Sequence, residues 1–445
     1  MRVFYFRKNQ SNEYFRRIVR HVRSTKQGHE MRQSVLGDPI KRLFRVWAVC
    51  VPVFFTVLAP LAVSETPPRK SSLELPEDAS TVHDVRVLVR KQSGPVNIET
   101  DKPFWVLDRN RRPLFRGDRM AATPVVAQDN AIRLGAQIFR SAPVTVESTD
   151  GSVLLDGKPY RFSLTFRPLG NGQMMVVNEL PLEDYLRGVL PWEANPDWAK
   201  DALKAQAVAS RTYALFRMIE NRAEPYDVQQ DVSSQVYHGK SIEKPSTDAA
   251  IHETRGEVLT YRGKIFPAFF HSTSGGATTR ADYIWNIEPH PSLMGVQTEF
   301  SAASKHYRWK DDFASADILN VLRAHGAGNL ASLDEIRLLE IDASGRARRF
   351  EFRSGKTRIA VSSADFRMWM NPGKFKSTKI EAVQKRGDRF LFQGFGWGHG
   401  VGLCQYSAKQ LGELGYNYRE ILKYFYPGSE LTFYGAEDRD TMTQS

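Results

Sequence analysis

Apolar residues follow two different spacings along this chain, and the change falls near Asn178. From residue 85 onward they form short runs separated by turn residues, a pattern typical of β-strands. The pairs Asp150-Gly151 and Asp156-Gly157 lie between such runs and predict hairpin turns. The segment before Asn178 is therefore expected to be rich in β-strand.

Beyond this point the spacing becomes helical. The segment 181–193 predicts a short helix. A longer helix is predicted to follow, with Asn195 as its N-cap and Pro196 as its first helical residue. A further helix is predicted over 314–324, and strands are predicted over 335–362. A β-rich stretch followed by a mixed one predicts an α+β fold.

The same patterns divide the chain into segments. A Pro-, Ser- and charge-rich stretch reads as a linker, and the last residues are polar. The expected order is a basic leader with an apolar stretch (1–64), a linker (65–84), a β-rich module (85–171), a mixed α+β domain (172–434) and a polar tail (435–445).

Composition excludes several classes of protein. Of 445 residues 41% are hydrophobic and 25% charged, as in ordinary globular chains. The two cysteines, Cys50 and Cys404, exclude a disulfide scaffold and a CxxC-type zinc module. The net charge is +12, of which residues 1–64 contribute +9 with 12 basic and 3 acidic residues. The rest is nearly balanced, so no nucleic-acid partner is expected.

The segment 46–64 carries no charge and follows Lys41, Arg42 and Arg45. A basic flank before an apolar stretch is typical of a secretory signal, here with cleavage after Ser64. A retained membrane anchor fits the same pattern, and a buried core helix is the third alternative. Met31 begins a leader of ordinary signal length, which suggests it as the true start. Signal and anchor both predict that the body of the protein is exported.

Glu193 is the first candidate for chemistry. It lies in GVLPWEANPDW, between Trp192 and Trp198. A carboxyl beside apolar rings loses hydration, which raises its pKa and suits it to general acid catalysis. A nearby helix N-terminus would oppose that shift. The alternative is an ordinary surface glutamate at a helix start.

Two further segments have unusual composition. HSTSGG (271–276) combines hydroxyl groups with two glycines, which permit a tight turn close to a ligand. A hydroxyl-rich structural turn is the alternative. GFGWGHGVGLCQY (394–406) surrounds Trp397 and His399 with glycines, poor sequence for a strand. It suits a binding loop in which an aromatic ring stacks on a sugar.

Taken together, these segments resemble the SpoIID/LytB family, which comprises stage II sporulation protein D and the LytB amidase enhancer. The resemblance covers about 172–434 and rests on five motifs in matching order. They are NELPLEDYLRGVLPWE (178–193), ALKAQAVASRTYAL (202–215), FHSTSGG (270–276), SGRARRFEF (344–352) and GFGWGHGVGLCQYSA with YREILKYFYPGSEL (394–431). The resemblance implies an exported cell-wall protein. Sporulation members of the family are lytic transglycosylases that cut peptide-free glycan strands beside a cell-wall amidase.

The resemblance also implies roles for single residues. The family's catalytic glutamate corresponds to Glu193, which would serve as the single general acid and base. Gln206, Arg211 and Tyr213 are the expected support behind it. The expected substrate groove is formed by Tyr237, Ser272, Gly275, Gly276, Trp285, Trp397, His399 and Gln405.

Two rival functions stay open at this point. The first is a non-catalytic module that binds glycan and activates an amidase. The second is a metal-dependent hydrolase that uses His238, His271 and His399, although their spacing gives no metal-ligand pattern. Some relatives hold a metal through cysteines, but none occurs here between Cys50 and Cys404. No metal and no cofactor are therefore expected.

Overall fold

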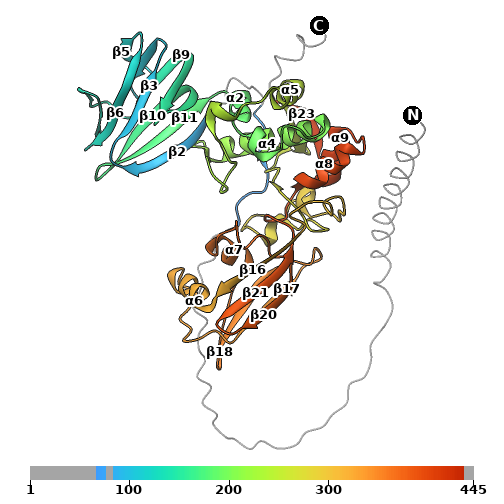
Figure 1. Cartoon of the computed structure of the whole chain (residues 1–445). Coiled ribbons are helices and arrows are strands. Elements are labelled where there is room, and N and C mark those ends of the chain that lie inside the picture. The colour runs from blue at the N-terminus through green and yellow to red at the C-terminus, as the bar shows by residue number, and fades with distance from the viewer. Residues whose placement is uncertain (1–66, 77–83, 435–445) are drawn as a thin grey trace, which may run out of the picture. The chain divides into compact units, whose positions relative to one another are not determined.

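A computed structural model describes residues 67–76 and 84–434 (Figure 1). The chain divides into two units, Met1–Pro67 and Pro68–Ser445, and the second contains every element described below. Strands and helices are both abundant, which confirms the α+β class. The signal or anchor predicted for 46–64 lies outside the described residues. Within the part of the chain that is described, no helix has the length and apolar character needed to cross a bilayer.

One large sheet contains the β-rich part of the chain. Its strands pair in the order β12-β2-β11-β10-β9-β3-β6-β7-β8, and β4 joins it through β9 with β5 beside it. The strands are β2 (Val85–Ser93), β3 (Val96–Thr100), β4 (Phe104–Leu107), β5 (Pro113–Gly117), β6 (Met120–Gln128), β7 (Ala131–Leu134), β8 (Gln137–Phe139), β9 (Val144–Leu155), β10 (Lys158–Gly170), β11 (Gln173–Leu180) and β12 (Val228–Gln229). Alternation along β3 buries Val96, Ile98 and Thr100 and exposes the residues between them.

The two predicted hairpin turns have different outcomes. Asp156-Gly157 forms the turn between β9 and β10, with φ of 49° and 79°. These positive values are those of a two-residue hairpin turn. The prediction at Asp150-Gly151 is wrong, because β9 continues through it. The register against β10 shifts there instead, from Ser152↔Arg161 to Glu147↔Ser163, which is a bulge.

The large sheet continues past residue 171, where the sequence analysis placed a domain boundary. Strand β11 pairs with both β10 and β2. Strand β12, about fifty residues later, pairs in parallel with β2. The sheet and the helices that follow it therefore share one hydrophobic core, which includes Leu180, Tyr185 and Ala207.

The helices that follow are α2 (Leu182–Arg187), α3 (Leu190–Glu193), α4 (Lys200–Glu220) and α5 (Pro245–Glu253). The predicted start of the long helix is wrong. Helix α4 begins five residues after Asn195, which accepts a hydrogen bond from Asp197 N–H at 2.9 Å and so caps a turn. Small residues permit a close approach of α4 to its neighbours, because a Cβ on Gly412 would lie 3.3 Å from the Cβ of Ala202.

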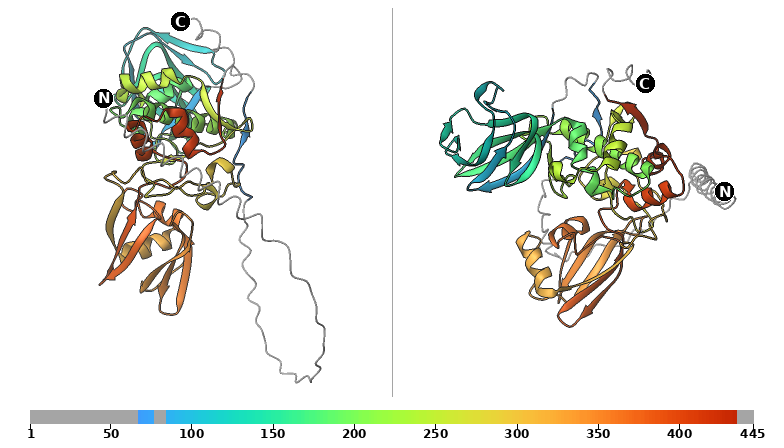
Figure 2. Two further views of the ribbon diagram at one scale, coloured as in Figure 1. Left: turned by 90° about the vertical axis from the view of Figure 1, so that its right-hand side faces the viewer. Right: turned by 45° about the horizontal axis from the view of Figure 1, so that its top comes forward.

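Helix α4 is the centre of the helical part. It packs against α5, β13 (Glu257–Tyr261), α8 (Gln405–Glu413) and α9 (Tyr418–Phe425). Figures 1 and 2 both show the two C-terminal helices beside it. The short helical segments of this part are η2 (Gly239–Ile242), η3 (Ala281–Tyr283) and η4 (Pro291–Leu293).

A four-stranded sheet in the order β1-β14-β13-β23 closes this region. Besides β13 it contains β1 (Leu73–Glu74), β14 (Lys264–Ile265) and β23 (Glu430–Phe433). Leu73 pairs with Ile265, and Arg69 N–H donates to Asn286 O at 3.0 Å. Residues 67–76 are thus bound to the domain, although the sequence analysis treated them as linker.

Between residues 308 and 395 the chain forms two three-stranded sheets and two helices, in the order expected over 314–362. The elements are β16 (Arg308–Ala314), α6 (Ser315–Ala324), β17 (Glu335–Ile341), β18 (Ala347–Ser354), β19 (Thr357–Ser362), α7 (Ser363–Trp369), β20 (Ile380–Arg386) and β21 (Arg389–Phe395). They enclose their own aromatic core, which contains Phe350, Phe366, Phe375 and Phe392. We call the segment 308–395 the insertion. The short strands β15 (Phe270–His271) and β22 (Leu403–Cys404) flank it in sequence and pair with each other in parallel.

Arg211 fixes α2 against α4. Its guanidinium is fully buried and contacts both carboxylate oxygens of Glu183, at 2.7 and 2.8 Å. It also donates to the carbonyl oxygens of Ile251 and Glu257 at 3.2 Å. Arg211 is fully buried and only 18% of the Glu183 side chain is exposed, so the loss of Arg211 leaves a largely buried carboxylate without its ion-pair partner.

Arg211→Met is expected to destabilise the protein by about 3–5 kcal/mol, because Glu183 would lose its buried partner. Denaturant unfolding of both proteins measures this. Lys409→Met is the matched control, since the pair Lys409–Glu413 is largely exposed, and it should cost about 0.5 kcal/mol. Equal losses in the two variants would contradict the role given to Arg211.

Candidate functional site

A cleft of about 640 Å³ contains Glu193. Its walls come from six parts of the chain. They are the end of α3 with the turn after it, the loop 232–236, the segment 270–272, His306, the residues around α7, and the segment 397–406. Lining residues from these parts include Trp192, Trp198, Val236, His271, Ser272, His306, Arg367, Trp397, His399, Gln405 and Tyr406.

Glu193 ends the four-residue helix α3 and is half-buried. Val236 N–H donates to its Oε1 at 3.0 Å, and Gln405 Nε2 donates to its Oε2 at 3.3 Å. Burial raises the pKa of the Glu193 carboxyl, and the two hydrogen bonds act in the opposite direction. The N-terminus of α4 does not adjoin it as the sequence suggested, since α4 begins only at Lys200.

Aromatic rings surround the carboxyl. Trp192 is 59% exposed and its ring centroid lies 4.3 Å from that of His238. Trp198 packs edge-on against Tyr406 at 5.4 Å. Trp397 packs on His306 at 4.4 Å and donates from its indole N–H to Pro372 O at 3.2 Å. Such rings offer flat apolar faces to a ligand.

Val401 fixes two histidines of the cleft. His271 donates from Nδ1 to Val401 O at 3.0 Å, and His399 Nδ1 accepts from Val401 N–H at 3.1 Å. Burial lowers the pKa of His271, and it lowers that of His399 to about 3 with help from the charge of Arg367. Both rings are therefore neutral near pH 7, and they act as oriented polar groups.

Two cations, the buried Arg346 and the half-buried Lys379, hold the HSTSGG turn. Arg346, of the SGRARR motif, is 1% exposed and donates to the carbonyl oxygens of Ser274 and Ala277 at 2.7 and 2.9 Å. Lys379 Nζ donates to Gly275 O at 2.7 Å. The turn therefore serves to position the neighbouring Ser272 and His271 at the cleft.

The glycines of the segment 394–402 permit close packing of the protein on itself. A Cβ on Gly400 would lie 2.4 Å from the guanidinium of Arg346. A Cβ on Gly402, where φ is 68°, would lie 1.9 Å from Phe269 O. That carbonyl accepts hydrogen bonds from Leu403 N–H and the Tyr426 hydroxyl, so this approach joins β22 to the core.

The structure separates the groove residues expected from sequence into two sets. Four line the cleft together with Glu193: Ser272, Trp397, His399 and Gln405. Four do not. Tyr237 is 1% exposed and donates to Asn178 Oδ1 at 2.6 Å, so it belongs to the core. Gly275 and Gly276 belong to the supported turn, and Trp285 stacks on Phe269 at 4.1 Å outside the cleft.

The three residues expected to support Glu193 contact other parts of the protein instead. Gln206 donates to Ser210 Oγ at 3.1 Å within α4. Arg211 holds Glu183, as described above. Tyr213 lines a second, smaller pocket. None of the hydrogen bonds to Glu193 described above comes from these three side chains.

Apart from Gln405, support of Glu193 comes from residues that sequence reasoning missed. Gln235 precedes Val236 and links two elements, since Tyr185 hydroxyl donates to its Oε1 at 3.0 Å and it donates to Ser210 O at 3.3 Å. This fixes the loop whose N–H binds Glu193. Arg367 and His306 were also missed. The polar segment DVSSQ (231–235) was a weak sequence signal for Gln235. No local sequence feature could reveal that the backbone N–H of Val236 donates to Glu193.

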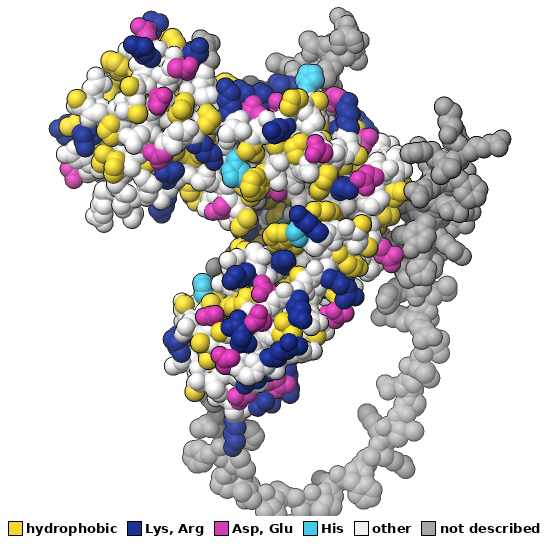
Figure 3. Space-filling view, viewed as in Figure 1, with side chains coloured by type: hydrophobic (Ala, Val, Ile, Leu, Met, Phe, Trp, Pro, Cys, Tyr) yellow, Lys and Arg dark blue, Asp and Glu magenta, His cyan; other side chains and the backbone are white. Residues whose placement is uncertain are grey.

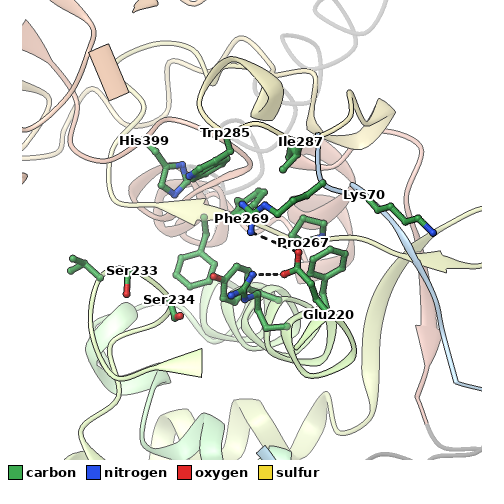
Figure 4. A pocket seen from close by; sticks show the side chains of 15 residues that line it. Lys70, Glu220, Ser233, Ser234, Pro267, Phe269, Trp285, Ile287 and His399 are labelled. Carbon is green, nitrogen blue, oxygen red and sulfur yellow. Dashed lines mark hydrogen bonds and ion pairs between the residues drawn. The ribbon is translucent and has the colours of Figure 1, made fainter. Parts of the chain in front are cut away.

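The second pocket, of about 180 Å³, shares Val232, Ser234, Phe270 and His399 with the cleft. Figure 4 shows Trp285 beside His399, and Glu220 joined to two guanidinium groups. These belong to Arg69, at 3.8 Å, and Arg217. The two arginines that line this pocket are thus paired with an acid.

The residues show no metal site of the kind considered from sequence. His271 and His399 lie 5.5 Å apart between ring centroids, and His238 packs on Trp192 instead. Among the described residues, no group of three or more His, Cys, Asp or Glu side chains is placed to hold a metal ion.

Comparison with known proteins identifies the family. A family model described as a stage II sporulation protein matches residues 170–261, and a model described as a domain of unknown function matches 283–402. An uncharacterized protein of Brachyspira hyodysenteriae is 34% identical over 298 residues, 67% of this chain and 78% of that protein.

Two relatives with descriptive names are from Bacillus subtilis. Its amidase enhancer is 30% identical over 335 residues, 64% of this chain and 46% of the enhancer. Its stage II sporulation protein D is 28% identical over 280 residues, 58% of this chain and 76% of the relative. The chain belongs to the SpoIID/LytB family.

Gly402→Ala is expected to destabilise the protein by at least about 3 kcal/mol, because the new Cβ would displace Phe269 O and strain a positive φ. Gly415→Ala is the matched control. Its φ is 84°, but nothing lies within 4 Å of the added Cβ, so it should cost about 1 kcal/mol. Thermal unfolding compares them, and similar melting temperatures would contradict the packing role of Gly402.

Proposed function

We propose that this chain is an exported peptidoglycan-remodelling enzyme, a lytic transglycosylase that cuts peptide-free glycan strands. One observation carries the proposal. Of the described residues that line the cleft, Glu193 is the one acidic side chain, and burial raises its pKa. Membership of the SpoIID/LytB family and the exposed ring of Trp192 support a cell-wall glycan as the ligand. The apolar run 46–64 supports export.

The mechanism needs one carboxyl group. The protonated Glu193 donates its proton to the glycosidic oxygen, and the bond from that oxygen to the anomeric carbon breaks. The 6-hydroxyl oxygen of the same muramic acid then bonds to the anomeric carbon. Its proton returns to Glu193, and the carboxyl group is restored. The product carries a 1,6-anhydro end and no water is consumed, so the second carboxylate that glycoside hydrolases use has no role.

The groups around Glu193 suit these steps. Val236 N–H and Gln405 stabilise the carboxylate that exists between the two proton transfers. The neutral histidines His271 and His399 add no positive charge next to the developing oxocarbenium ion. Rings of Trp198, Tyr406 and Trp397 offer faces for the sugars on both sides of the bond.

A second candidate function rests on the amidase enhancer of Bacillus subtilis, to which the chain is 30% identical. In this alternative the same cleft binds glycan without cutting it, and a cell-wall amidase is the partner. The next experiment separates the two functions.

Glu193→Gln should keep the fold and reduce cleavage by about 10²–10⁴-fold or more, because the amide cannot transfer the proton. Release of anhydro-muramic products from peptide-free glycan measures this. The matched control is Glu224→Gln on the exposed surface, which should cleave normally. Normal cleavage by a folded Glu193→Gln chain would refute the assignment. If the unmodified chain releases no product but stimulates an added amidase, the enhancer function is correct.

Gln405→Leu should move the pH profile of kcat/KM. The acid step requires protonated Glu193, so kcat/KM falls as pH rises through the pKa of this carboxyl. The hydrogen bond from Gln405 favours the ionised form, and its removal raises that pKa. The falling limb should therefore shift to higher pH. Gln410→Leu, outside the cleft, should leave it in place; a shift to lower pH in Gln405→Leu would contradict this geometry.

A further inference from the structure

Arg367 is a buried cation with an incomplete set of partners. It lies in the last turn of α7, is 9% exposed and lines the cleft that contains Glu193. Its Nε donates to Lys376 O at 3.0 Å, and one terminal nitrogen lies 3.7 Å from the weak acceptor Met368 Sδ. No carboxylate of the described residues forms an ion pair with it. Buried guanidinium groups are ordinarily paired, as Arg211 is with Glu183.

The surroundings of Arg367 are also cationic. Burial and the charge of Arg346 lower the pKa of Arg367 to about 10. Lys376 Nζ lies 5.4 Å from the ring centroid of Trp397, another residue that lines the cleft. Residues 301–400 contain 18 Lys or Arg against 11 Asp or Glu, and Figure 3 shows these basic side chains spread over the part that holds β16–β21. An anion bound at Arg367 would offset this excess of charge.

The chemistry of the glycan identifies such an anion. Its repeating disaccharide has one ionisable group, the carboxyl of the lactyl ether on muramic acid. In a strand that carries peptides this carboxyl is an amide and has no charge. In a peptide-free strand it is a carboxylate, the planar acceptor that a guanidinium binds best.

We propose that Arg367 binds the lactyl carboxylate of muramic acid and thereby selects strands from which the peptide has been removed. This inference rests on the proposed function, since it takes the cleft to be a glycan site. It also places the protein after an amide hydrolysis, the class of reaction that must supply its substrate. Arg367 is then a specificity-determining residue, and Glu193 performs the chemistry.

Binding measurements test this without any cleavage. The probes are peptide-free glycan with free lactyl carboxylates and the same glycan with those groups converted to methylamides. In the full chain carrying Glu193→Gln, the free acid should bind about ten- to a hundredfold more tightly than the amide. Adding Arg367→Gln should make the two dissociation constants equal. Arg367→Lys, which also loses the hydrogen bond to Lys376 O, should restore part of the preference because it keeps the charge.

Arg358→Gln is the control for a general loss of positive charge, since Arg358 is exposed on β19 and does not line the cleft. It should keep the preference. A preference that survives Arg367→Gln, or that is absent from the parent chain, overturns the inference and leaves the transglycosylase proposal standing. Failure of both probes to bind overturns the glycan site itself. If the chain prefers the free acid but never cleaves glycan, the role of Arg367 is supported and the transglycosylase proposal is refuted.

Discussion

The parallel pairing of β15 with β22 is the contact on which the cleft depends. It joins Phe270 to Leu403 and His271 to Cys404, on the two sides of a long insertion. A parallel pair this short has little stability of its own. Buried contacts on both sides reinforce it, above all the approach of Gly402 to Phe269 O and the hydrogen bond between His271 and Val401. Through this pairing Gln405 reaches Glu193, although 212 residues separate them.

Two cationic side chains of the insertion give it its structural role. Arg346 and Lys379 donate to carbonyl oxygens of the 274–277 turn, which would otherwise lie buried without donors. Arg367 lies nearby without a carboxylate partner among the described residues, and lines the cleft instead. The insertion therefore supports the turn and also contributes a wall of the cleft.

Sequence reasoning predicted the α+β class and the regions of strand and helix, because these depend on local spacing. It failed at Asn195, whose side chain caps a turn and not the helix, since both arrangements use the same residue types. It placed Glu193, Trp397, His399 and Gln405 in one site, and they do share a cleft. It also assigned Tyr237 and Arg211 to that site. A residue within a motif can serve packing as well as ligand binding. The side chains of Tyr237 and Arg211 are buried in the core. Arg367 carries no local signal, because its place at the cleft results from the fold of the insertion.

The fate of water in the reaction tests the central claim most directly. Peptide-free glycan would be digested by the full chain in water enriched in oxygen-18, and the new ends would be weighed by mass spectrometry. If Glu193 returns the proton of the 6-hydroxyl as described, every new muramic end is lighter by one water than a hydrolysis product and carries no heavy oxygen. New ends that each contain one oxygen-18 atom would show that water is the nucleophile, and would contradict the account of Glu193 as a single acid and base in a lytic reaction.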